Sequence, residues 1–267
     1  MKKWIPHSLF SKLNHRRGKK VLEDHTFDLF SKFFKKDQNY KMYRNYNLEG
    51  SPNEKDILIL SKYSAFIIEC KASKLRKPLR DSDIAFSRIK KDFKECIQKG
   101  YNQCFEVEKQ CLYEDSFIIE QSKGKKINVD SSNLVNIFSI VVTLEMFGPI
   151  QTNLSFLLEK ESKEDYFPWA VSVDDLEIFL KTIKITKNNP INSFIKYLDV
   201  REKLHDKILT SDEMDICASY LKNPKKFKSE LNSYDFILLD PTLQNYFDDF
   251  YYSNSLKFDT NSNYYKR

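Results

Sequence analysis

Residues 53–71 read NEKDILILSKYSAFIIECK, and this stretch decides the fold. Two runs rich in apolar residues flank the short polar segment 61–64, a pattern that predicts two β-strands joined as a hairpin. A turn centred in that segment pairs residues whose numbers sum to 125, so that Asp56 lies opposite Glu69. Directly opposed side chains of a hairpin have Cβ atoms about 5 Å apart. The hairpin therefore brings two carboxylates together.

A lysine stands beside the two acids. Glu69 and Lys71 are two residues apart on one strand and therefore point to the same face of the sheet. Facing carboxylates repel each other unless a cation lies between them. Carboxylate oxygens favour Mg²⁺ or Mn²⁺, and a lysine beside such a metal can orient a water, or help to deprotonate it, for attack on phosphorus. The alternative is a surface hairpin with a solvated Lys–Glu pair.

The sequence around the hairpin predicts further strands and helices. A helix, then strands, a long crossover helix and another buried strand indicate an α/β core, and the pattern becomes helical after it. The expected strands span residues 40–46, 56–60, 65–71, 135–144, 155–158 and 169–173. The expected helices span residues 18–36, 84–112, 174–183, 191–207, 211–222 and a stretch near 241–252.

This arrangement resembles the PD-(D/E)xK nuclease superfamily. The motif is D-x₁₂-ExK on a hairpin, and Lys55 stands where the superfamily usually has a proline before the first acid. The resemblance covers about residues 18–145 and is strongest to nuclease domains of prokaryotic defence and repair proteins. It implies a restriction-endonuclease-like α/β fold, in which helices flank a mixed β-sheet. We accordingly divide the chain into a nuclease domain, residues 1–172, and a mostly helical C-terminal extension, residues 173–267.

The resemblance also implies roles for the motif residues. Asp56 and Glu69 would bind the metal, Mg²⁺ or Mn²⁺, together with the backbone carbonyl of Cys70. Lys71 would be the catalytic lysine. The implied reaction is metal-dependent hydrolysis of DNA phosphodiester bonds, in a prokaryotic antiviral defence or DNA-processing system. A non-catalytic nucleic-acid-binding or scaffold subunit on the same fold is the alternative.

Helical geometry singles out an acid on the first helix. At about 100° per residue, Glu23 lines up with the apolar Phe27 and Phe30, whereas Asp24 falls on the opposite, lysine-bearing side. The resemblance implies that Glu23 is a supporting metal or water ligand. The alternative is an acid placed near the helix N-terminus by the helix dipole.

A glutamine on the long helix is a further candidate. Gln103 falls at the edge of an apolar stripe that includes Cys96 and Cys104, and Gln98 points the opposite way. The resemblance implies that Gln103 reaches the active site or the DNA. A glutamine at the boundary of the core is the alternative.

The charge of the chain is unevenly distributed. The net charge is +6, but residues 1–126 carry 28 Lys and Arg against 17 Asp and Glu, while residues 127–267 carry 16 against 21. This asymmetry predicts that the first half faces an anionic partner, with a merely solvated lysine-rich surface as the alternative. We expect nine basic side chains to bind DNA phosphates without reading sequence. These are Arg16, Arg17, Lys19, Lys20, Lys74, Arg76, Lys77, Arg80 and Arg88. The acidic, aromatic C-terminal region is expected to bind a protein partner or a second copy.

Composition excludes several other classes. Only 5 of 267 residues are glycine, and no stretch approaches the glycine-rich loops that hold nucleotide phosphates. The five cysteines form no CxxC pair, so neither a structural zinc site nor disulfides are expected, and a reducing cytoplasm is the predicted location. No apolar run approaches the roughly 20 residues that span a bilayer, and no signal-peptide core forms, so we expect a soluble protein.

Overall fold

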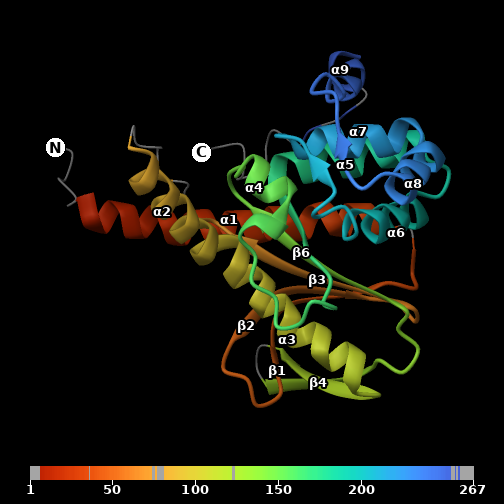
Figure 1. The fold of residues 1–267 in the computed structure, drawn as a ribbon. Coiled ribbons are helices and arrows are strands. Elements are labelled where there is room, and N and C mark those ends of the chain that lie inside the picture. Colours follow the sequence, from red (N-terminus) through yellow and green to blue (C-terminus); the bar gives the residue numbers. More distant parts are fainter. Residues whose placement is uncertain are drawn as a thin grey trace.

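The computed structural model describes residues 7–35, 37–73, 76, 81–121, 124–253, 256 and 258, and for residues 7–19 only the course of the backbone. A mixed sheet of seven strands in the order β5-β4-β1-β2-β3-β6-β7 forms its centre (Figure 1). The strands are β1 (Lys41–Leu48), β2 (Glu54–Leu60), β3 (Ser64–Lys71), β4 (Ser116–Gln121), β5 (Lys125–Asp130), β6 (Asn136–Thr143) and β7 (Trp169–Ser172). This confirms the predicted α/β fold class.

Helices flank the sheet on both faces and continue into the C-terminal part. In chain order they are α1 (His7–Phe34), α2 (Ser82–Phe93), the π-helical turn η1 (Lys94–Gln98), α3 (Lys99–Tyr113), α4 (Pro149–Thr152), the 3₁₀ turn η3 (Leu154–Phe156), α5 (Val173–Thr186), α6 (Pro190–Arg201), α7 (Glu213–Lys222), α8 (Pro224–Ser233) and α9 (Asn245–Tyr252). Two short parallel strands, β8 (Ile208–Leu209) and β9 (Ile237–Leu238), pair outside the main sheet. Among the helices described, none is both long and apolar enough to cross a membrane.

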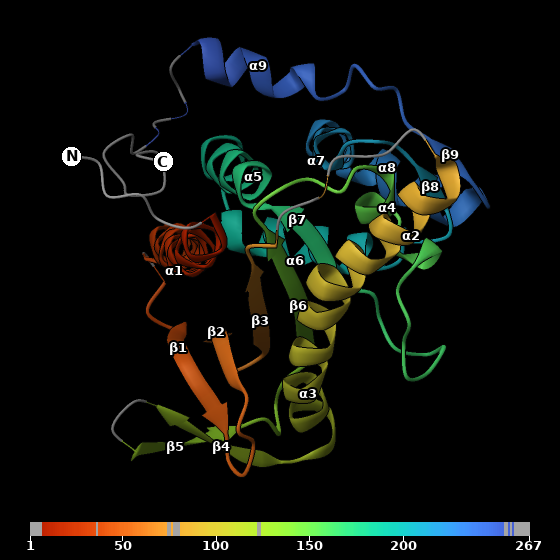
Figure 2. The ribbon, with the colours of Figure 1, turned by 90° about the vertical axis from the view of Figure 1, so that its left-hand side faces the viewer.

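Both faces of the central hairpin are buried, which explains its continuous apolar runs. Ile57, Ile59 and Ile68 belong to the core that α1 and α5 cover. Leu58 and Ile67, which alternate with them, belong to the core that α3 covers. Figure 2 shows the sheet between α1 and α3, and the same alternation places residues 67, 69 and 71 on the α3 side.

Helix α3 lies close to the sheet at a glycine. A Cβ atom at Gly100 would lie 2.7 Å from Cγ1 of Val141 on β6, so a larger residue would push the helix away. The π-helical turn η1 directly precedes this contact. The predicted single helix 84–112 is therefore two α-helices joined by a π turn.

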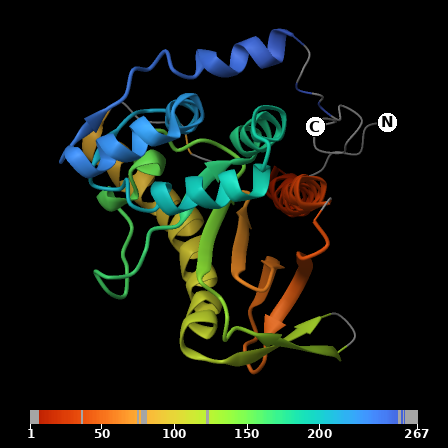
Figure 3. The same cartoon turned by 90° about the vertical axis from the view of Figure 1, so that its right-hand side faces the viewer.

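The C-terminal helices share one core with the sheet. The ring of Phe194 on α6 lies 5.5 Å from Phe33 on α1, 5.8 Å from Phe66 on β3 and 5.9 Å from Trp169 on β7. Figure 3 shows α5 and α6 against the same side of the sheet as α1. The division that we predict after residue 172 falls between β7 and α5, and the packing is continuous across it.

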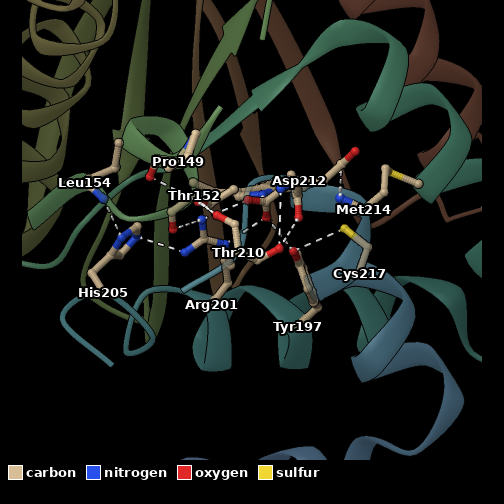
Figure 4. A network of polar contacts seen from close by, with 12 residues as sticks. Pro149, Thr152, Leu154, Tyr197, Arg201, His205, Thr210, Asp212, Met214 and Cys217 are labelled. Atoms are coloured by element: carbon tan, nitrogen blue, oxygen red, sulfur yellow. Dashed lines mark hydrogen bonds and ion pairs between the residues drawn. The ribbon is translucent and has the colours of Figure 1, made fainter. Parts of the chain in front are cut away.

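A buried polar network ties α6 and α7 to this core (Figure 4). The fully buried guanidinium of Arg201 donates to both carboxylate oxygens of Glu213, at 2.8 and 2.9 Å. Tyr197 and the indole of Trp169 donate to the same carboxylate, at 2.8 and 2.7 Å. Arg201 also donates to the carbonyl of Thr152 at 2.9 Å. Because the network joins α6, α7, β7 and α4, it fixes how these elements pack.

Some predicted elements were wrong. Residues 155–158 are no strand, because Leu154–Phe156 form a 3₁₀ turn. The helix predicted over 191–207 ends at Arg201, and a turn with Asp206 at a φ of 73° follows it. The β4–β5 hairpin and α8 were not predicted. In the lysine-rich β5 only Val129 is buried. The alternation of apolar and polar residues that indicates a strand is therefore nearly absent there.

Candidate active site

The register of the β2–β3 hairpin agrees with the prediction. Ile57 pairs with Ile68 and Leu60 with Ala65, so paired numbers sum to 125 as expected. The turn is closed by the backbone N–H of Ser61, which donates to the carbonyl of Ser64 at 2.8 Å. One step beyond the last pair, this register sets Asp56 opposite Glu69.

Short contacts join the acids and the lysine at this end of the hairpin. The backbone N–H of Asp56 donates to Oε1 of Glu69 at 3.3 Å, and the N–H of Cys70 donates to Oδ2 of Asp56 at 2.7 Å. Nζ of Lys71 donates to Oε2 of Glu69 at 2.6 Å. All three side chains are buried, with 5%, 1% and 9% of Asp56, Glu69 and Lys71 exposed. The structure thus brings the three predicted residues into one small buried cluster.

Burial and proximity shift the protonation of this cluster. Burial raises the pKa of Glu69, the charge of Asp56 raises it further, and the partial compensation by Lys71 leaves it at about 7. Burial alone lowers the pKa of Lys71, but the charges of Glu69 and Asp56 outweigh it, so the net pKa is above its ordinary value. Lys71 is therefore a cation at neutral pH.

The donor set suits a hard divalent cation. Two carboxylates and a backbone carbonyl, from Asp56, Glu69 and Cys70, are oxygen ligands, and Mg²⁺ often binds one or two carboxylates and keeps several waters. In the part of the chain that the structure describes, no three His, Cys, Asp or Glu side chains are grouped as a metal site. Water would have to complete the coordination. The Cys70 thiol is no candidate ligand, because it packs in the core on the α1 side.

The two acids of the first helix face different partners. Asp24 forms an ion pair with Arg44 on β1. Burial raises the pKa of the Cys70 thiol most, and the charges of Asp56, Glu69 and Glu23 raise it further. The carboxylate of Glu23 therefore lies near Cys70, the residue that follows Glu69 on β3.

A cavity of about 410 Å³ opens beside Lys71. The backbone segment from Cys70 to Ser73 lines it, together with Glu95, Lys99 and Gln103. Gln103 donates weakly to the carbonyl of Glu54, at 3.4 Å, so its side chain spans from α3 to the start of β2. The predicted candidate Gln103 therefore lies at the cluster.

Gln98 faces elsewhere, as predicted. Its side chain donates to the carbonyl of Glu159 and accepts from the N–H of the same residue, both at 2.8 Å. Glu95 and Lys99 were not singled out from the sequence. They stand eight and four residues before Gln103, and residues four apart share a helix face, so the position of Gln103 could have indicated them.

Lys55, at the position of the missing proline, is fully buried and binds Glu106 on α3 at 2.5 Å. This ion pair ties the start of β2 to the helix that carries Gln103. The departure from the superfamily motif thus has a structural role in this chain.

Three of the nine predicted phosphate-binding side chains can be placed. Lys20 and Arg88 are exposed. Arg76 is engaged by Asp92 at the end of α2: its Nε and its backbone N–H donate to the carboxylate at 2.7 and 3.0 Å. The others lie outside the described side chains: Arg16, Arg17, Lys19, Lys74, Lys77 and Arg80.

Comparison with protein families gives one match. Residues 20–143 match the family model of the nuclease-related domain (NERD), which has the restriction-endonuclease-like PD-(D/E)xK fold. The matched segment runs from α1 to the last residue of β6 and includes the acids and lysine of the cluster. Comparison with curated proteins and with solved structures gave no match.

Proposed function

Residues 20–143 form a nuclease-related domain, and we propose that it is a metal-dependent nuclease that hydrolyses DNA phosphodiester bonds. One observation carries the proposal. Hydrogen bonds through side chains and backbone link Asp56, Glu69 and Lys71, beside a cavity that Lys71 lines. Burying two acids and a lysine lowers the stability of the folded protein, because charged groups lose their hydration. We therefore infer that the cluster is present for a function.

The chemistry follows from the donor set. Asp56 and Glu69 would hold Mg²⁺ or Mn²⁺ with the carbonyl of Cys70. When bound, such an ion polarises a phosphoryl oxygen and lowers the pKa of a bound water. Lys71 stays protonated because its pKa is raised, so it would orient the water and stabilise negative charge on the phosphate, rather than accept a proton.

Other side chains would support this site. Glu23 would hold the metal or its waters from the α1 side, and Gln103 would contact the site or the DNA from α3. The basic residues of α1, α2 and the segment between β3 and α2 would bind phosphates, giving salt-sensitive binding with little sequence preference.

We place this activity in a prokaryotic antiviral defence or DNA-processing system in the cytoplasm. All five cysteines are free and buried, which suits a reducing compartment. The acidic residues and exposed tyrosines of α9, Tyr251 and Tyr252, would offer a surface to a protein partner or a second copy.

Cleavage assays test the proposal. The full-length protein is incubated with circular plasmid and with linear end-blocked DNA, in Mg²⁺, in Mn²⁺ or in a chelator. We expect cleavage that requires the metal and is lost in Lys71→Ala. Metal-dependent cleavage that Lys71→Ala retains would overturn the site. Saturable DNA binding without cleavage under any condition would instead establish the non-catalytic alternative.

A further inference from the structure

A second cavity lies far from the acid cluster. A hollow of about 680 Å³ opens where the start of α6, the end of α7 and the start of α8 meet. Figure 1 shows α6 and α8 on the opposite side of the molecule from α2, the helix that follows Lys71 in the chain. The volume of the hollow is within the range of sites for small organic ligands, about 300 to 1,000 Å³.

Lysines dominate the charge of this hollow. Five of them line it, with Asp199 as the single acid of the lining: Lys187, Lys196, Lys222, Lys225 and Lys228. They belong to residues 127–267, where acids outnumber bases by 21 to 16. The lining of the hollow is therefore positively charged although this half of the chain has a net negative charge. Like charges held around one concave space repel each other, and a bound anion relieves that repulsion.

Three of the five lysines already have a contact, and that of Lys222 is with the ring of Tyr246, 5.6 Å from its Nζ. Nζ of Lys187 donates to the carbonyl of Leu221 at 3.0 Å, and Lys228 stands 4.0 Å from Asp199. Lys196 and Lys225 are exposed and have no hydrogen bond or ion pair with any residue of the described chain. These two amino groups are therefore available to a ligand.

The remaining wall suits an organic part of the same ligand. Tyr220, Val200 and Pro224 give the hollow an apolar surface, and the Tyr220 hydroxyl already donates to the carbonyl of Ser193 at 3.2 Å. The Tyr220 ring also packs against Tyr197 and Phe227, and only 3% of the residue is exposed, so it offers a ligand a small apolar surface. The first turns of α6 and α8 also border the hollow and add positive potential to it.

We propose that this hollow is a second ligand site, which binds a small molecule that joins phosphate groups to an aromatic or apolar part, as a nucleoside diphosphate does. Its lysines would bind the phosphate groups, which a glycine-rich loop binds in other phosphate sites. Nucleic acid fits less well, because a long polyanion would extend beyond the hollow over an acid-rich half of the chain. The proposal does not depend on nuclease activity.

Calorimetric titration tests it with three probes: ADP, inorganic pyrophosphate and a single-stranded oligonucleotide. The full-length protein is titrated in a chelator, so that metal at the acid cluster does not contribute. We expect saturable binding of ADP and of pyrophosphate. In the double variant Lys196→Gln, Lys225→Gln, the Kd for ADP should rise at least tenfold, since two charge-assisted contacts are lost.

Lys226→Gln is the matched control, because Lys226 neighbours Lys225 on α8 but does not line the hollow and stands 3.6 Å from Glu230. Its Kd for ADP should stay within twofold of the wild type, as should that of Lys71→Ala. No saturable binding of ADP or pyrophosphate, or an equal loss in Lys226→Gln, would overturn the proposal. So would saturable binding of the oligonucleotide alone, which would identify a nucleic-acid surface.

Discussion

Nζ of Lys71 lies 2.6 Å from Oε2 of Glu69, two positions earlier on the same strand. Both groups are buried, so the lysine is the cation that stabilises this carboxylate in the structure. A metal bound by Glu69 would share the carboxylate with Lys71. The lysine therefore has two roles, one in the stability of the fold and one in the proposed chemistry.

Lys71→Ala should reduce cleavage below detection and also lower the Tm. Removing the ammonium leaves Glu69 buried without its cation, which raises the pKa of Glu69 above about 7 and destabilises the charged form. The Tm deficit should therefore grow from pH 6 to pH 9. Lys99→Ala is the control, since Lys99 lines the same cavity but is exposed. A Tm deficit independent of pH would contradict this account of the pair.

Asp56→Asn should abolish metal binding and leave the fold intact. The amide oxygen can still accept the N–H of Cys70, so the backbone contact is kept while one negative charge is lost. Mn²⁺ should raise the Tm of the wild type and have little effect on the variant. The exposed Asp83→Asn should behave as wild type. An unchanged Mn²⁺ response in Asp56→Asn would exclude Asp56 as a ligand.

Glu23→Gln and Asp24→Asn should differ sharply in cleavage. Glu23 lies near Cys70, whose carbonyl is a proposed metal ligand, so its loss should weaken Mg²⁺ dependence and slow cleavage by about 100-fold. Asp24 forms a half-exposed ion pair with Arg44, so its loss should cost less than about 1 kcal/mol of stability and leave cleavage nearly unchanged. Both variants are titrated with Mg²⁺ in one assay, and the reverse ranking would identify Asp24 as the ligand.

Arg76→Gln and Arg88→Gln should separate stability from DNA affinity. Arg76 holds the buried Asp92, so its loss should lower the Tm. Arg88 is exposed, so its loss should leave the Tm unchanged, weaken DNA binding for all sequences and reduce the salt slope by about one unit. Equal Tm losses in the two variants would refute this division of roles.

Asp175→Asn should stabilise the protein at alkaline pH. Burial, with the charges of Asp212 and Glu213, raises the pKa of Asp175 from 3.8 to about 7. The folded state then binds this proton more tightly than the unfolded state, so wild-type stability falls as pH rises from about 4 to about 7. The variant lacks that fall, and its Tm advantage should be absent at pH 4 and largest at pH 8. The exposed Asp235→Asn is the control, and an advantage equal at both pH values would disprove the titration.

The hairpin could be predicted from sequence because its information is local. The apolar runs, the polar turn and the spacing of Asp56, Glu69 and Lys71 lie within 19 consecutive residues, and the position of the short turn fixes the register of the hairpin. The helix that bears Glu23 was predicted for the same reason, since its apolar positions repeat within a few turns.

Contacts between distant segments were decided only by the tertiary structure. The sequence showed Arg76 as one of many basic residues, and packing gave it Asp92 as a partner. It showed one long helix, and the structure has a π turn directly before the close contact of Gly100 with Val141.

The lysine hollow and the shared core of α1, α6 and the sheet likewise join residues more than 20 positions apart. Local periodicity determines which face of an element is buried. Which faces meet, and which charges then stand together, depends on the packing of the whole chain.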